Sequence, residues 1–209
     1  MAISRKVADQ ALEKDFEHQR ALMVERHVAA RGVKDARVLQ AMRDVPRHLF
    51  VPSLMASKAY GPGALPIGSN QTISQPYIVG RMIELLELTG GEKVLEIGTG
   101  TGYQTVVLSK VCAKVFSIER INELALRAAE MIRNLKIYNA SVKVFDGTYG
   151  WSDQAPFDRI IVAAAAPSVP EPLVQQLARI TRVGTRVQIE DFGEAEFVPL
   201  VGRFGAQES

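Results

Sequence analysis

The stretch VLEIGTGTGYQT, which runs from Val94 to Thr105, joins a short apolar segment to a turn rich in glycine. A carboxylate, Glu96, lies two residues before the first glycine. The glycines stand at alternate positions, Gly98, Gly100 and Gly102. Such a turn after a strand lets a ligand approach the backbone closely. The dinucleotide fingerprint would place its third glycine at Tyr103 or Thr105, so the turn lacks a feature that pyrophosphate binding requires.

The sequence after Lys93 alternates between strands and helices. The expected strands are short runs of Val, Ile and Leu, typical of strands that are covered on both faces. They lie at residues 93–97, 114–118, 141–145 and 157–165. This order predicts an α/β fold with a doubly wound, mainly parallel sheet. Helical spacing of apolar residues before Val51 adds an N-terminal helical layer, with Asp35 as a candidate helix cap.

Composition and charge restrict the possible functions. The chain has 209 residues, 47% of them hydrophobic, and its formal net charge of +2 is too small to indicate nucleic-acid binding. No apolar run is long enough to span a bilayer, and the first ten residues lack the apolar core of a secretory signal. The single cysteine, Cys112, precludes an internal disulfide, so we expect a cytoplasmic protein without a membrane partner. The three histidines show no metal-ligand spacing, and we expect no metal site.

Three successive strands end at or beside a carboxylate, namely at Glu96, Glu119 and Asp146. Ligands of doubly wound sheets bind beyond the carboxyl ends of the strands. Glu96 would repel a phosphate but suits a ligand that carries positive charge. S-adenosyl-L-methionine has an ammonium, a sulfonium and a ribose but no phosphate, so it is the cofactor we expect. Glu119 is placed for its ribose hydroxyls and Asp146 for its adenine amino group.

Three stretches together resemble a known family. VLEIGTGTGYQT, LPIGSNQTISQP and FDRIIVAAAAPSVPEPLVQQL are similar to the bacterial type of the protein-L-isoaspartate O-methyltransferase family. The resemblance runs from about Val33 to Leu177 and resumes at FVPLVGR, and the QTISQP loop is its most specific part. It implies a Rossmann-like methyltransferase fold and an enzyme that methylates the α-carboxylate of L-isoaspartyl residues in damaged proteins, which initiates repair. The partners implied are isoaspartyl-containing proteins and peptides.

The resemblance also implies roles for individual residues. Ser74 corresponds to the active-site serine of the family, and Ile73 and Val198 would line the substrate cleft beside it. We expect residues 1–68 to form the helical layer and the start of the substrate loop, and residues 69–209 to form the cofactor-binding core. The residues expected to bind the cofactor are Gln71, Thr72, Ile73, Ser74, Glu96, Gly98, Gly100, Gly102, Glu119, Arg120, Asp146 and Gly147.

The expected nucleophile is a substrate carboxylate, which is ionised at neutral pH and needs no general base. Ser74 would donate a hydrogen bond to it and would not act as a covalent nucleophile, because no base accompanies it. The alternative role for Ser74 is to cap the helix that begins near Pro76. Two other functions stay open: a methyltransferase of a small molecule or nucleic acid, and a non-catalytic nucleoside-binding module. The polar QTIS loop argues against the second.

One position departs from the family pattern. Ala178 is followed directly by Arg179, where the family has a glycine turn and an apolar strand. Either the strand is deleted, which would leave unpaired backbone groups in the sheet, or a segment is absent from the sequence as given. We favour the second explanation, because loss of an internal strand should exceed the few kcal/mol of margin that a domain has.

Overall fold

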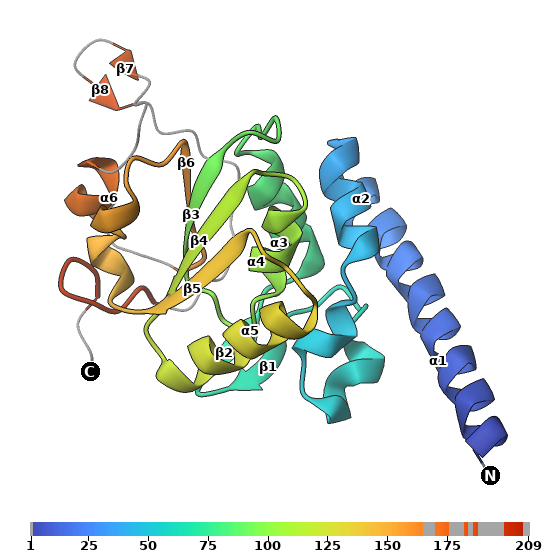
Figure 1. Cartoon of the computed structure of the whole chain (residues 1–209). Coiled ribbons are helices and arrows are strands. Elements are labelled where there is room, and N and C mark those ends of the chain that lie inside the picture. The colour runs from blue at the N-terminus through green and yellow to red at the C-terminus, as the bar shows by residue number, and fades with distance from the viewer. Residues whose placement is uncertain (1, 165–169, 176–181, 184–185, 188–198, 207–209) are drawn as a thin grey trace.

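The structure is a computed structural model of the chain, and it describes residues 2–164, 170–175, 182–183, 186–187 and 199–206 (Figure 1). Its centre is a sheet of four parallel strands in the order β5-β4-β3-β6. The strands are β3 (Lys93–Ile97), β4 (Lys114–Glu119), β5 (Ala140–Val144) and β6 (Arg159–Val162). Helices lie on both sides of this sheet (Figure 1), so the predicted doubly wound fold is confirmed.

Alternation along β3 places its side chains in two separate apolar cores. Val94 packs into a core that contains residues of the helices on one face. Leu95 and Ile97 pack into the core on the other face, together with Phe157. Because successive side chains of a strand point to opposite faces, a strand covered on both sides is apolar throughout. The exceptions in β3 are Lys93 at its start and Glu96, which is fully buried.

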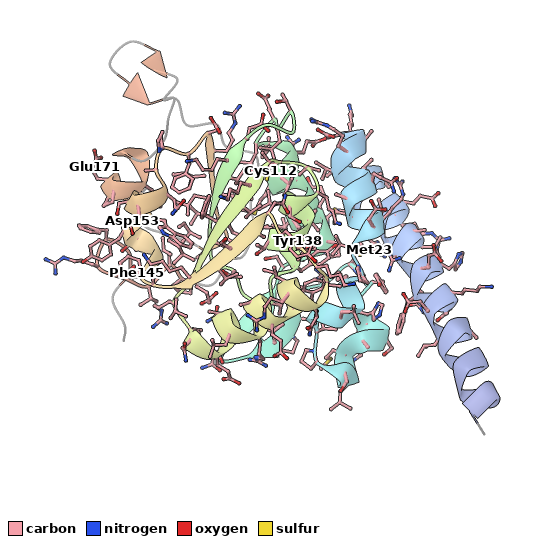
Figure 2. All side chains as sticks on the ribbon, in the orientation of Figure 1. Met23, Cys112, Tyr138, Phe145, Asp153 and Glu171 are labelled. Carbon is pink, nitrogen blue, oxygen red and sulfur yellow. The ribbon has the colours of Figure 1, made fainter. Side chains whose placement is uncertain are left out.

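The predicted N-terminal helical layer is present. Helix α1 (Ala2–Met23) leads into a π-helical turn, η1 (Val24–Val28), and a 3₁₀ turn, η2 (Ala29–Arg31). The N-terminal end of α1 projects away from the sheet (Figure 1), whereas Met23 at its other end is buried in the core (Figure 2). Helix α2 (Ala36–Asp44) follows, and Asp35 caps it by accepting hydrogen bonds from two backbone N–H groups, as predicted.

The connecting elements bring the functional loops to one edge of the sheet. They are η3 (Arg47–Phe50), η4 (Ser53–Lys58), β1 (Leu65–Gly68), β2 (Gln71–Ile73), α3 (Pro76–Glu84), α4 (Tyr103–Ser109) and α5 (Asn122–Asn134). Strands β1 and β2 form an antiparallel hairpin. Its turn residues, Ser69 and Asn70, both have positive φ, as a two-residue hairpin turn of type I′ requires.

The remaining described elements belong to the second half of the chain. They are η5 (Gly147–Tyr149), η6 (Ser152–Gln154), α6 (Glu171–Gln175), β7 (Arg182–Val183) and β8 (Arg186–Val187), the last two paired antiparallel. The junction of Ala178 and Arg179 lies outside the described residues, and so does Val198. The boundary expected between residues 68 and 69 stays a prediction. No helix within the described ranges is long and apolar enough to cross a bilayer.

Candidate active site

A pocket opens at the carboxyl ends of β3 and β4. Its wall combines the loop before α3, the glycine turn, the tip of β4 and a segment near residue 200. Of the twelve residues expected to bind the cofactor, nine line this pocket: Gln71, Thr72, Ile73, Ser74, Gly98, Gly100, Glu119, Arg120 and Gly147. Sequence reasoning missed Pro199, Leu200 and Val201, which follow the predicted Val198 directly.

The glycine turn depends on backbone conformations that only glycine adopts easily. Gly98 has a φ of 94°, and a Cβ there would lie 3.4 Å from the carbonyl oxygen of Ala163. Gly102 has a φ of 86°, and a Cβ there would lie 3.3 Å from the Cβ of Ala128 in α5. Gly102 does not line the pocket. Its observed role is therefore close packing of the turn against α5, and its predicted cofactor contact has no support in this geometry.

Glu119 ends β4 and holds the glycine turn in place. Its Oε2 accepts a hydrogen bond from the N–H of Gly100 at 2.8 Å, and its Oε1 accepts one from the N–H of Ile121 at 2.9 Å. The side chain is 8% exposed and lines the pocket. Each carboxylate oxygen has two lone pairs, so both can still accept a hydrogen bond from a ligand hydroxyl.

Glu96 occupies a different place from the one expected. It accepts hydrogen bonds from Gln104, Thr105 and Ser117 on the face of the sheet that α4 covers. Burial raises the pKa of this carboxyl to about 7, although these three donors act in the opposite direction. Glu96 does not line the pocket. Glu96 instead belongs to a buried polar network between strand and helix, because the alternation of β3 turns this side chain inward, and its predicted contact with a positively charged ligand group stays a prediction.

Asp146 also faces the protein and does not line the pocket. Its Oδ1 caps η5 by accepting from the N–H and hydroxyl of Thr148, and its Oδ2 accepts from the N–H of Arg203 at 2.9 Å. Partial burial raises its pKa, but the hydrogen bonds from Arg203 and Thr148 outweigh this and lower the pKa below its ordinary value. The next residue, Gly147, does line the pocket, and a Cβ there would lie 2.5 Å from Ile97.

Ser74 lies in the pocket wall directly before α3. The N-cap of α3 is Gln75, and no side chain caps this helix, so the alternative interpretation of Ser74 as a helix cap is wrong. The carbonyl oxygen of Ser74 accepts a hydrogen bond from Nη2 of Arg47 at 2.8 Å. The sequence analysis missed Arg47, because it belongs to none of the motifs that predicted the site and to no periodic pattern of apolar residues.

The pocket fits S-adenosylmethionine by the chemistry of its lining. Glu119 offers carboxylate oxygens to a ribose, the turn at Gly98 and Gly100 presents backbone without Cβ atoms, and apolar side chains such as Ile73 and Leu200 complete the wall. A parallel sheet with this turn after its first strand, this carboxylate after its second, and no third glycine of the dinucleotide fingerprint indicates the class of S-adenosylmethionine-dependent methyltransferases.

Comparisons with known proteins define the family within this class. The sequence profile of protein-L-isoaspartate(D-aspartate) O-methyltransferase matches residues 17–195. A protein-L-isoaspartate O-methyltransferase of Syntrophus aciditrophicus is 44% identical over 211 aligned positions, which cover 91% of this chain and 97% of the relative. The chain therefore belongs to the protein-L-isoaspartate(D-aspartate) O-methyltransferase family.

Solved structures agree with this assignment. A structure titled protein-L-isoaspartate O-methyltransferase has a TM-score of 0.68 at 29% identity, over 77% of this chain and 52% of that chain. A putative protein-L-isoaspartate O-methyltransferase from Plasmodium falciparum, in complex with S-adenosyl-L-homocysteine, has a TM-score of 0.64 at 26% identity, over 77% of this chain and 80% of that chain. The predicted Rossmann-like methyltransferase fold is thus confirmed, and the chain is a methyltransferase enzyme.

The alignment with the Syntrophus relative also bears on the departure at Ala178. An alignment of 211 positions that uses 91% of a 209-residue chain leaves about 20 positions without a residue of this chain. That difference has the size of one strand with its turns. The choice between a deleted strand and an absent segment at Ala178 stays a prediction.

Proposed function

We propose that the chain methylates the α-carboxylate of L-isoaspartyl residues in damaged proteins, with S-adenosyl-L-methionine as methyl donor, and thereby initiates their repair. The observation that carries this proposal is the meeting of the QTIS loop and the glycine turn in one pocket, with Ser74 in its wall and Glu119 at its base. Family membership supports the same substrate class.

The residues proposed to hold the cofactor are those of the pocket wall. When bound, S-adenosylmethionine supplies an electrophilic methyl group. Glu119 would accept hydrogen bonds from the ribose hydroxyls, and each such bond to a charged acceptor contributes about 1.5–3 kcal/mol. Gly98 and Gly100 allow the ligand to approach the backbone closely, while Gln71, Thr72, Arg120 and Gly147 complete the walls on either side.

The role proposed for Ser74 is to hold the substrate. Its hydroxyl donates a hydrogen bond to the carboxylate and orients one oxygen toward the methyl group. Ile73, which is largely buried in the pocket wall, excludes water, and Val198 is proposed to line the substrate side. Orientation and exclusion of water together can account for about 7–11 kcal/mol of a barrier.

Among the described residues that line the pocket, Glu119 is the only group that could act as a general base. Its oxygens already accept two backbone hydrogen bonds. This composition agrees with a nucleophile that is already ionised, because ester formation at a carboxylate requires no proton transfer. A small-molecule methyltransferase that activates a hydroxyl or amine would need a base at this place. A non-catalytic binding module would not need the loop that carries Ser74.

A turnover assay tests the proposal. The chain is incubated with methyl-labelled S-adenosylmethionine and either a peptide with one L-isoaspartyl residue or its twin with normal aspartate. We expect label in the isoaspartyl peptide alone, in a base-labile ester. Equal labelling of both peptides contradicts the proposed selectivity for isoaspartate. Cofactor binding without labelling of either peptide contradicts the proposal and favours one of the other two functions.

We also propose that the enzyme acts in the cytoplasm on soluble protein substrates. The support is the single cysteine, Cys112, which is buried beside α4 and cannot form an internal disulfide. Localisation of a fluorescent fusion tests this, and a signal confined to an extracytoplasmic compartment would contradict it.

A further inference from the structure

Arg47 is a buried cation whose charge no carboxylate of the described residues balances. Its side chain is completely buried and does not line the pocket. Its Nε donates to the carbonyl oxygen of Ala59 at 2.8 Å, and its Nη2 donates to the carbonyl oxygen of Ser74 at 2.8 Å. Two neutral carbonyl groups are thus its hydrogen-bond partners, and a buried charge without a counter-ion is costly.

Two further polar atoms at this place have no hydrogen bond of normal geometry among the described residues, although their two side chains interact electrostatically with each other. They are Nη1 of Arg47 and the hydroxyl of Tyr103, both fully buried. The guanidinium carbon lies 4.7 Å from the centroid of the Tyr103 ring. Tyr103 is the first residue of α4, directly after the glycine turn, and it lines the pocket. Arg47 therefore contacts both the loop that carries Ser74 and the residue that follows the cofactor turn.

The two hydrogen bonds fix the backbone on which Ser74 stands. Arg47 holds the Ser74 carbonyl without itself lining the pocket, and Pro76 restrains the chain two residues later. The Ser74 hydroxyl forms no hydrogen bond within the described part of the chain, and it is therefore available to a ligand. A guanidinium can bind two acceptors at once in a fixed geometry, whereas a lysine ammonium is a single flexible point charge.

We propose that Arg47 is a positioning residue of the methyl-transfer site: it holds the Ser74 carbonyl so that the Ser74 hydroxyl faces the substrate carboxylate. The inference rests on the proposed function. It assigns to Arg47 a selective effect on the substrate, because the cofactor residues Glu119 and Gly100 are held by hydrogen bonds of their own.

The test compares Arg47→Lys with the wild type on an isoaspartyl peptide. We expect kcat/KM to fall about tenfold or more, because one hydrogen bond to a charged group is worth about this much. The larger part of the change should be an increase in KM. Affinity for S-adenosylhomocysteine, measured by titration calorimetry, should stay within about twofold. Arg159→Lys is the matched control, since Arg159 also donates from Nε to a backbone carbonyl, that of Leu86, away from the pocket.

A double-mutant cycle with Ser74→Ala separates positioning from a merely structural role. If Arg47 acts through the Ser74 hydroxyl, Arg47→Lys should lower kcat/KM much less in the Ser74→Ala background than in the wild type. Equal effects in both backgrounds, or a parallel loss of S-adenosylhomocysteine affinity, would overturn the proposal. Arg47→Gln is the second variant, and loss of folding in both variants would also overturn it, because Arg47 would then determine the fold. Failure of the proposed function is distinguishable, since the wild type itself would not label the peptide.

Discussion

Replacing Glu96 by glutamine should stabilise the enzyme at high pH and leave its stability unchanged at low pH. Burial places the pKa of this carboxyl at about 7 in the folded chain, against 4.5 for an unperturbed glutamate. The folded state therefore keeps a proton between these two values that the unfolded state has lost. The unfolding free energy falls as pH rises through this window, and a separation of about 2.5 pH units corresponds to about 3 kcal/mol.

The hydrogen-bond partners of Glu96 permit the exchange. Oε1 faces the amide N–H of Gln104, which can only donate, whereas Oε2 faces the hydroxyls of Thr105 and Ser117, which can also accept. A glutamine at position 96 can therefore place its oxygen toward Gln104 and its NH₂ group toward the two hydroxyls. The neutral amide replaces the protonated carboxyl without leaving a buried group unsatisfied.

The assay is urea unfolding followed by circular dichroism, at pH values from 4.5 to 8. We expect the variant to exceed the wild type by about 3 kcal/mol at pH 8, and this difference should vanish at pH 4.5. Glu123→Gln on the exposed side of α5 is the control and should differ from the wild type by less than about 0.5 kcal/mol at every pH. A difference for Glu96→Gln that does not depend on pH would refute the reasoning. Affinity for S-adenosylhomocysteine should be unchanged, because Glu96 does not line the pocket.

Three further substitutions test the pocket. Glu119→Ala should lower the affinity for S-adenosylhomocysteine about tenfold or more, since it removes the ribose acceptor and the support of Gly100; unchanged affinity in calorimetry would exclude Glu119 from the site. Ser74→Ala should lower turnover of the isoaspartyl peptide and leave Tm unchanged, because no helix cap is lost; a fall in Tm alone would contradict its substrate role. Gly102→Ala should lower the unfolding free energy by about 1–2 kcal/mol because of its positive φ, and an unchanged urea midpoint would argue against strain at the turn.

Local sequence signals were enough to predict the sheet and the place of the glycine turn at its edge. The strand pattern and the glycines located the turn, and Glu119 was found because it directly follows an apolar strand. Asp35 was found as a cap from its place before a helical pattern. These features depend on residues close together in the sequence, where spacing alone determines the geometry.

The sequence could not predict side-chain orientation where packing between distant elements decides it. Glu96 also stands near a strand end, but it is one residue earlier than Ile97, so its side chain points toward α4. Asp146 faces inward because the N–H of Arg203, far along the chain, reaches its carboxylate. Arg47 was not predicted because its role depends on hydrogen bonds to the backbone carbonyl groups of Ala59 and Ser74, and no sequence pattern indicates such contacts.

The composition of the pocket wall has a consequence for biosynthesis. One side of the wall comes from residues 71–74 and another from residues 199–201, about 125 positions later. A ribosome adds about 5–20 residues per second, so the earlier side waits on the order of ten seconds for the later one to be made. The glycine turn and the parallel strands around it can form during this interval, but the pocket still lacks a wall. The methyl donor therefore gains its full set of contacts, and its full stabilising effect on the fold, only after translation has passed residue 201.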